Sequence, residues 1–251
     1  MIRTVLVLLW FIVFFASTLP VLLVFYIIRM FSPEKCELYS QNTVRILVKG
    51  LLFLSGVKVT VKGRENVPPN ETLLYVPNHR SYFDFLLAYD NVSGPVTFVG
   101  KQELKKVPVM GQWIVAMGTL LLNRGSVKEG LKVINEACDK IKSGTNVFIF
   151  PEGTRNKGIQ EEPLPFKDGS LKISSWTGCR VIPVAIINSR SIYEEHRPYI
   201  RRTPVTVIFG EPVDPESLSK EDRKAYGAYI RAKIINMILQ EEETGKETED
   251  V

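Results

Sequence analysis

The sequence contains only three cysteines and two histidines, and this shortage limits the disulfides and metal sites that it can form. Its three cysteines, Cys36, Cys138 and Cys179, are odd in number and far apart, and none belongs to a CxxC pair. We therefore expect a reducing compartment, without a disulfide framework or a zinc site. The sequence also lacks a GxSxG nucleophile elbow and a P-loop, which argues against a serine hydrolase and a nucleoside triphosphatase. No cluster of metal ligands stands out, so we expect no metal and no cofactor.

Positive charge is concentrated in the body of the chain. The formal net charge is +5, but the tail from Glu241 to Val251 holds six acidic residues and Lys246, so residues 1–240 carry +10. Such a body favours phosphate esters, anionic lipid headgroups or nucleic acid. Aromatic residues do not interleave with the basic ones as a nucleic-acid platform requires. We therefore expect a membrane surface or a phosphorylated substrate as partner, and no nucleic acid.

The N-terminal segment is a long apolar run. From Thr4 to Ile28, 25 residues carry no charge, and Arg3 and Arg29 bracket them. One helix of that length measures roughly 38 Å and can cross a hydrocarbon core of about 30 Å. We interpret it as a retained membrane anchor rather than a signal peptide, because the run is long and lacks a convincing small-x-small cleavage site. Because arginines flank both ends, the sequence does not indicate the orientation of this helix. It also leaves open whether the helix spans the bilayer or enters only one leaflet.

A second helix is predicted over residues 33–56, where apolar residues recur at helical spacing and basic residues interrupt them. It suits the bilayer interface through its basic side chains. Packing against the rest of the chain explains the pattern equally well.

After residue 56, short β-branched runs alternate with helical ones. This alternation predicts an α/β fold with a mostly parallel or mixed central sheet flanked by helices. The expected strands are 58–62, 72–76, 96–99, 119–122, 147–150, 181–187 and 205–209, and the clearest helices are 127–141, 171–176 and 223–239. We thus expect an N-terminal two-helix membrane anchor over 1–56, an α/β domain over 57–240, and an acidic flexible tail over 241–251.

The first chemical motif runs from Asn78 to Asp84, after the second predicted strand. Open α/β sheets bind ligands at the carboxyl ends of their strands. On one continuous helix, His79 and Asp84 would point about 140° apart, so they can meet only if His79 lies on the turn and Asp84 in the first helical turn. Ser81 as N-cap, with Asp84 three residues later, supports that geometry. The same pattern also fits a plain helix cap with an ordinary turn histidine.

A histidine–aspartate pair would suit the activation of an alcohol, which is a poor nucleophile near neutral pH. An imidazole can accept the hydroxyl proton as the new bond forms, an effect typically worth about 10²–10⁴ in rate. The carboxylate would fix the tautomer and stabilise the imidazolium without taking the proton itself.

The second motif, Phe150–Arg155, again follows an apolar strand. Its proline and glycine force a turn that brings Glu152, Thr154 and Arg155 together at the strand end. Arg155 suits a bidentate grip on phosphate, and backbone N–H groups near Gly153 can add to it. A plain strand-to-loop turn is the alternative.

The third motif, Gly118–Arg124, is a strand that ends in a lone arginine, which by itself also fits a surface residue. Upstream, the run 101–106 adds positive charge, including Lys105. The apolar stretch 107–117 between them suits either the core or a slot for an acyl chain.

Together these blocks resemble the glycerolipid acyltransferase family, whose ordered motifs are NHx₄D, GxxFIxR, FPEGTR and a block centred on V/I-P. The matching segments, in order, are Asn78–Asp84, Gly118–Arg124, Phe150–Arg155 and Ile182–Val184. Phe166–Gly169 is also similar to the F-K-x-G run that follows FPEGTR. The departure is Leu121-Leu122 in place of Phe-Ile, which keeps the apolar character. The resemblance covers about residues 73–187.

The resemblance implies a membrane enzyme. The short chain, its apolar N-terminus and its intact FPEGTR look like the 1-acyl-sn-glycerol-3-phosphate acyltransferases of the bacterial PlsC type. These move an acyl group from acyl-carrier protein or acyl-CoA to the 2-hydroxyl of lysophosphatidic acid, forming phosphatidic acid. A location at the cytoplasmic membrane, with the active site facing the cytosol, is implied as well.

The resemblance also implies residue roles. His79 would be the general base and Asp84 its partner, with the acceptor hydroxyl attacking the thioester directly. Pro183 would help shape the acyl-donor site. The glycerol phosphate would be bound by Arg124, Glu152, Gly153, Thr154 and Arg155. We add Lys105 to these phosphate-binding residues on the basis of its charge and position alone.

Two alternatives stay open at this point. The same motifs serve acyltransferases that use glycerol 3-phosphate or another lysophospholipid as acceptor. A non-enzymatic lipid-binding or scaffold protein on the same fold would be of a different class, and it predicts that the His79–Asp84 pair can be lost without consequence.

Overall fold

The computed structural model describes residues 1–123 and 125–249, with side chains through residue 244. The helices are α1 (Ile2–Ser17), α2 (Leu19–Phe31), α3 (Pro33–Ser55), α4 (Phe83–Asn91), α5 (Met110–Ala116), α6 (Val127–Lys142), α7 (Asp168–Thr177), α8 (Lys220–Lys224) and α9 (Tyr226–Glu249). The strands are β1 (Lys58–Lys62), β2 (Leu74–Pro77), β3 (Val96–Lys101), β4 (Leu120–Leu122), β5 (Asn146–Phe148), β6 (Val181–Ile187) and β7 (Pro204–Phe209). Short 3-10 segments are η1 (Arg64–Asn66), η2 (Gln102–Lys106) and η3 (Ser189–Ile192).

The seven strands form one sheet in the order β1-β7-β6-β2-β5-β3-β4. Strands β6 and β7 pair antiparallel, and the other neighbours pair parallel. The predicted α/β fold with a mixed, mostly parallel sheet is therefore confirmed. The β-branched runs located the strands well, because each observed strand begins and ends within two residues of its predicted bounds.

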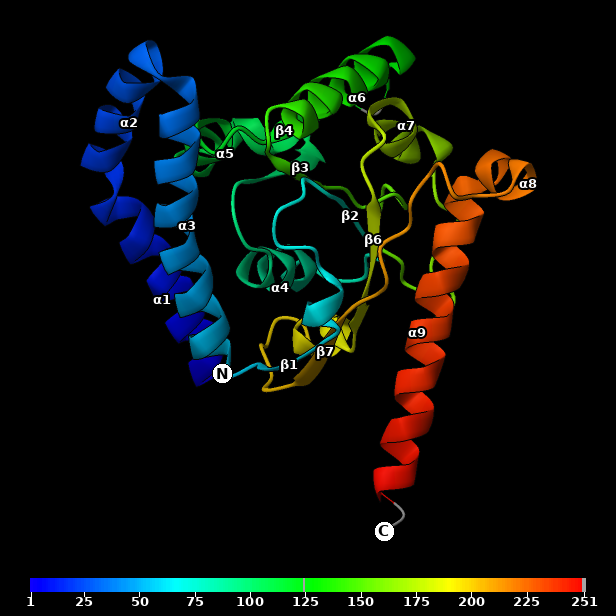
Figure 1. Ribbon diagram of the computed structural model, residues 1–251. Helices are drawn as coiled ribbons and strands as arrows, with labels where there is room; N and C mark the ends of the chain where they lie inside the picture. Colours follow the sequence, from blue (N-terminus) through cyan, green and yellow to red (C-terminus); the bar gives the residue numbers. More distant parts are fainter. Residues whose placement is uncertain (124, 250–251) are drawn as a thin grey trace.

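Helices cover both faces of the sheet (Figure 1). Successive strand residues point to opposite faces, so Tyr75 joins the core beneath α3, α4 and α5, while Leu74 and Val76 join the core beneath α6, α7 and α9. All four residues of β2 are buried, as expected for a central strand covered on both sides. The run 107–117 contributes Trp113, which is 1% exposed, to the first core.

The apolar N-terminal segment is bent, which corrects the prediction of one continuous helix. It forms α1 and α2, inclined at 51° with a break at Thr18. Pro20 has no N–H to donate to a carbonyl four residues earlier, and its ring clashes with that position, so it favours a new helix start. Among the described residues no single helix is long and apolar enough to cross a bilayer, whereas α1 and α2 together are.

Helix α3 is the common support for this bent pair. The Trp10 indole Nε1 donates to the Leu47 carbonyl at 3.0 Å, and the ring lies against Gly50, where even a β-carbon would overlap it. The Arg29 guanidinium at the end of α2 donates to the Val115 carbonyl in α5 at 3.1 Å. The N-terminal helices are thus packed onto the α/β part of the chain, as Figure 1 shows at the left.

Helix α9 continues through Glu249, past Glu241 where a flexible tail was expected to begin. Ile230, Ile234 and Ile238 recur every four residues and are fully buried against the sheet. The Glu241 carboxylate accepts from Lys62 Nζ in β1 at 2.6 Å. Residues 250 and 251 lie outside the described part of the chain.

The sheet order brings three segments to one edge. Strand β2 lies between β5 and β6 and runs parallel to both, so the residues that follow these strands meet at their carboxyl ends. Two of these segments carry the predicted motifs, after β2 and after β5. The third follows β6 and includes η3. This edge is where an open α/β sheet binds ligands.

Candidate active site

Asn78 fixes the start of the first motif. Its amide exchanges two hydrogen bonds with Ile186 in β6: the Ile186 N–H donates to Oδ1 at 2.7 Å, and Nδ2 donates to the Ile186 carbonyl at 2.9 Å. The side chain is buried and replaces the ladder bonds that β2 no longer makes. The chain therefore leaves β2 toward His79 from a defined point.

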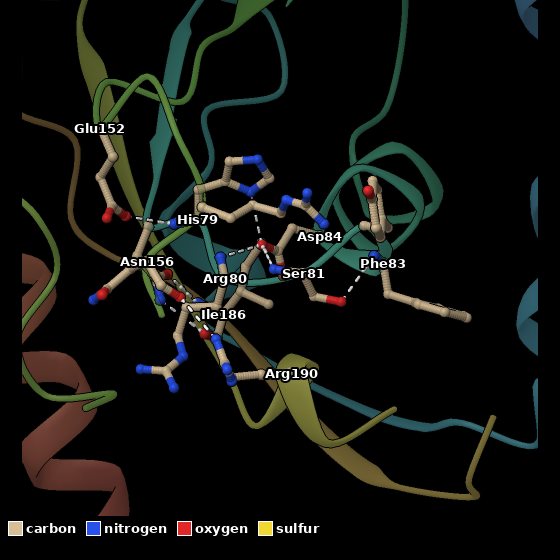
Figure 2. A network of polar contacts seen from close by, with 12 residues as sticks. His79, Arg80, Ser81, Phe83, Asp84, Glu152, Asn156, Ile186 and Arg190 are labelled. Atoms are coloured by element: carbon tan, nitrogen blue, oxygen red, sulfur yellow. Dashed lines mark hydrogen bonds and ion pairs between the residues drawn. The ribbon is translucent and has the colours of Figure 1, made fainter. Parts of the chain in front are cut away.

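The Asp84 carboxylate is the centre of this turn. Its Oδ2 accepts from His79 Nδ1 at 2.9 Å, from the Arg80 N–H at 2.6 Å and from the Ser81 N–H at 2.7 Å. Asp84 is fully buried, and the dashed lines of Figure 2 converge on this oxygen. The predicted meeting of His79 on the turn with Asp84 in the first helical turn is thus present in the structure.

The capping pattern is present too, slightly shifted. Ser81 Oγ accepts from the Phe83 N–H at 3.1 Å, while Asp84 accepts from the Ser81 N–H. This is the reciprocal arrangement of a capping box, with the serine reaching two residues forward instead of three. The two interpretations of Asp84, helix cap and histidine partner, are therefore compatible in one geometry.

The contact to Asp84 assigns the tautomer of His79. A carboxylate only accepts hydrogen bonds, so Nδ1 is the donor of this contact, and in the neutral imidazole the lone pair lies on Nε2. The imidazole side chain is 21% exposed and lies on the Phe150 ring, with centroids 4.1 Å apart. A neutral imidazole held through Nδ1 in this way has the form that a general base requires.

Glu152 of the second motif points inward. Its Oε1 accepts from the His79 N–H at 2.6 Å, its Oε2 accepts from the Leu164 N–H at 2.8 Å, and the residue is 4% exposed. Burial raises its pKa to about 7, although the two backbone donors favour the charged form. In this geometry Glu152 holds the backbone of the His79 turn, whereas the family resemblance implies a role in binding the glycerol phosphate.

Arg155 points the other way. Its guanidinium carbon lies 3.6 Å from the Tyr82 ring centroid, and Nη1 lies 3.3 Å from Glu194 Oε1. The side chain is 30% exposed. A guanidinium has five N–H donors in a planar fork, so donors remain for a phosphate after the bond to Glu194.

Gly153 and Thr154 form the turn between Glu152 and Arg155. The Gly153 N–H donates to the Phe150 carbonyl at 3.1 Å and φ is +66°, so the glycine closes a turn that a side chain would strain. The Gly153 N–H is therefore occupied within the turn. The missing β-carbon leaves room for the Lys167 ammonium, and Thr154 is exposed beside it.

The other predicted residues lie elsewhere or outside the description. Lys105 lies in η2 and lines a groove of about 1060 Å³ beside β4, whose lining contains no residue of the His79 turn. Pro183 is buried within β6, and its ring lies close to Gly210. Arg124 lies outside the described residues.

Two residues of the site carry no motif signal. The Asn156 N–H donates to the His79 carbonyl at 2.7 Å, and Glu194 contacts Ser81, Tyr82 and Arg155. Glu194 follows β6 in a polar run, and only the placement of β6 beside β2 brings it to the site.

Among residues 1–123 and 125–244, whose side chains the structure describes, no three His, Cys, Asp or Glu side chains are grouped as a metal site would require.

Comparison with known proteins decides the family. The family model described as "Acyltransferase" matches residues 58–187, which include the His79 turn and the Phe150–Arg155 turn. This chain belongs to the Acyltransferase family. The resemblance drawn from the four motifs is thereby confirmed.

Relatives within the family share a name. The 1-acyl-sn-glycerol-3-phosphate acyltransferase of Borreliella burgdorferi is 27% identical over 78% of this chain and 77% of its own length. Its namesake from Salmonella typhimurium is 27% identical over 88% of this chain and 94% of its own length. The crystal structure of the 1-acyl-sn-glycerophosphate (LPA) acyltransferase PlsC from Thermotoga maritima superimposes with a TM-score of 0.71, at 28% identity, over 96% of this chain and 98% of that one.

Proposed function

We propose that this protein transfers a fatty acyl group from an acyl-thioester to the 2-hydroxyl of 1-acyl-sn-glycerol-3-phosphate, forming phosphatidic acid. One observation carries the proposal: the 2.9 Å contact between His79 Nδ1 and Asp84 leaves Nε2 as a base at the carboxyl edge of the sheet. The relatives of similar length are named for this activity, which supports the choice of acceptor.

The chemistry proceeds in two steps. His79 Nε2 accepts the proton of the acceptor hydroxyl as its oxygen attacks the thioester carbonyl, and Asp84 stabilises the imidazolium. The tetrahedral intermediate then expels the thiolate, which takes the proton from His79. The acceptor hydroxyl is itself the nucleophile, so no serine or cysteine of the chain is acylated.

The acceptor phosphate binds beside this base. Arg155 is the best-placed cation, because its guanidinium is partly exposed and lies next to Tyr82 at the start of α4. We retain Thr154 and Arg124 as further phosphate ligands on the strength of the family motifs. Glu152 acts on the phosphate only indirectly, by holding the His79 backbone, and Lys105 is a more distant contributor.

The acyl donor is acyl-carrier protein or acyl-CoA, and the acceptor reaches the site from a bilayer. Pro183 contributes to the donor site from inside β6. The bent pair α1–α2 anchors the protein at the cytoplasmic membrane, with the active site on the cytosolic side. Large apolar side chains exposed on this pair support an anchor: Val5, Leu8, Leu9, Ile12, Leu23, Val24, Ile27, Met30 and Phe31.

The test is an acceptor series with purified, detergent-solubilised protein and a long-chain acyl-CoA or acyl-carrier protein. Lysophosphatidic acid, glycerol 3-phosphate and lysophosphatidylcholine are compared at matched concentrations by product analysis. We expect phosphatidic acid as the main product. Acylation of only one of the other two acceptors would keep the family and overturn the acceptor, and no acylation of any would favour a scaffold.

A further inference from the structure

Glu194 bridges two motifs that lie far from it in the sequence. It follows η3, in the segment after β6, and its side chain is only 6% exposed. Its Oε2 accepts from Ser81 Oγ at 2.7 Å, and its Oε1 accepts from the Tyr82 N–H at 2.8 Å. The same Oε1 lies 3.3 Å from Arg155 Nη1.

These contacts connect the base to the phosphate-binding side of the site. Ser81 and Tyr82 lie immediately before α4, and the Ser81 N–H also donates to Asp84. Arg155 belongs to the turn after β5, and it lies across the Tyr82 ring. One carboxylate therefore sets the position of the α4 start and of the arginine relative to each other.

Arg155 needs this support because a long, partly exposed side chain has many rotamers. The Tyr82 ring restricts the guanidinium to a plane, and Glu194 fixes its rotation in that plane through Nη1. The remaining donors then face a constant direction, which is the requirement for a bidentate grip on phosphate.

We propose that Glu194 is a positioning residue that orients the Arg155 guanidinium toward the phosphate of the acceptor lipid. The inference rests on the proposed function and adds a residue to it. A carboxylate suits the role because both its oxygens only accept. In Glu194→Gln one oxygen is replaced by an NH₂ group, and the charge that holds Arg155 is lost.

The test measures kcat and KM for acceptor and donor in wild type, Glu194→Gln, Arg155→Lys and the double variant. Glu195→Gln is the matched control, because its neighbouring carboxylate pairs with Arg190 instead. For Glu194→Gln we expect KM for lysophosphatidic acid to rise about tenfold, the scale of one charge-assisted hydrogen bond. We expect kcat within about threefold of wild type, an unchanged KM for the donor, and wild-type behaviour in the control. The double variant should resemble Arg155→Lys, because both changes remove the same oriented contact between the Arg155 guanidinium and the phosphate.

An unchanged acceptor KM in Glu194→Gln, or an effect that adds fully to that of Arg155→Lys, would overturn the inference while leaving the reaction intact. An equal rise in donor KM, or a loss confined to kcat, would also overturn it, since either indicates a general structural role. If the wild type prefers another phosphate-bearing acceptor, the proposed acceptor fails and the same ratios are measured on that acceptor. If it accepts only acceptors without phosphate, or none, both proposals fall.

Discussion

The turns after β2 and β5 lie at the same edge of the sheet but hold their polar side chains in different ways. In the turn after β2, Asp84 is buried and uses one oxygen to hold the His79 ring and two backbone N–H groups. In the turn after β5, Glu152 points inward to the His79 backbone, while Arg155 points outward to Tyr82. The His79 ring is thus held by Asp84 of its own motif. The arginine depends on a third segment, through Glu194.

This difference teaches which residues carry stability as well as activity. Buried acceptors that serve backbone donors should affect folding and catalysis together, because their loss leaves unpaired polar groups inside the protein. Partly exposed groups that face the substrate should affect catalysis with little change in stability. Four substitutions test this division.

Asp84→Asn should have the largest effect. The amide keeps one acceptor but no longer stabilises an imidazolium, so we expect kcat to fall by about 10²–10⁴. The crowded buried site should also lose about 1–3 kcal/mol of stability. Activity and thermal midpoint are measured together. Asp222→Asn is the matched control, because Asp222 accepts from Ser219 Oγ at the start of α8, far along the chain. If Asp84→Asn kept a tenth of the wild-type activity, the role of Asp84 as the partner of His79 would be contradicted.

Glu152→Gln should change how stability depends on pH. In the folded protein the pKa of Glu152 is raised from its ordinary 4.5 to about 7, so between these values the folded state holds a proton that the unfolded chain has lost. This stabilisation is present below pH 4.5 and is lost as pH rises through 7, on the order of 3 kcal/mol in total.

Glutamine resembles the protonated form at every pH. The thermal midpoint of the wild type minus that of Glu152→Gln should therefore fall by about 5–10 °C between pH 4.5 and 7.5. The exposed Glu216→Gln serves as control and should show no such trend. A difference that grows with pH would mean that the two backbone donors outweigh burial.

Arg155→Ala tests the outer half of the site. We expect kcat/KM for the phosphate acceptor to fall on the order of 30-fold, with the thermal midpoint nearly unchanged. Arg197→Ala is the comparison, since its guanidinium lies farther from the same Tyr82 ring, at 5.8 Å against 3.6 Å. A larger loss in Arg197→Ala than in Arg155→Ala would reverse the assignment.

Ser81→Ala should have the smallest effect. Loss of a helix-capping serine costs about 1 kcal/mol, and Ser219→Ala at the start of α8 removes a similar cap, far along the chain from the motifs. Both variants should lower the thermal midpoint by a few degrees. Only Ser81→Ala should also reduce activity, by a few-fold, because Ser81 Oγ is bonded to Glu194.

Much of this architecture is predictable from local patterns. β-branched runs located the strands, and the capping pattern at Ser81 led to the His79–Asp84 contact, because both depend on neighbouring residues. The break at Thr18 also had a local signal in Pro20, which the uncharged composition of the run concealed.

The remainder depends on the order of strands in the sheet, which local patterns do not contain. Glu194 joins the site only because β6 lies beside β2, and Lys105 lines a groove beside β4 because β4 is at the sheet edge. Glu152 carries a motif, but its inward direction follows from the two backbone donors that meet it in the folded chain.

The central claim is that His79 removes the proton of the acceptor hydroxyl. The most direct measurement is the rate of phosphatidic acid formation from lysophosphatidic acid by wild type and His79→Ala, in the same detergent and with matched thermal midpoints. We predict a loss of at least about 100-fold in kcat, the scale of removing a general base. A His79→Ala variant that forms phosphatidic acid within tenfold of the wild-type rate would contradict the account.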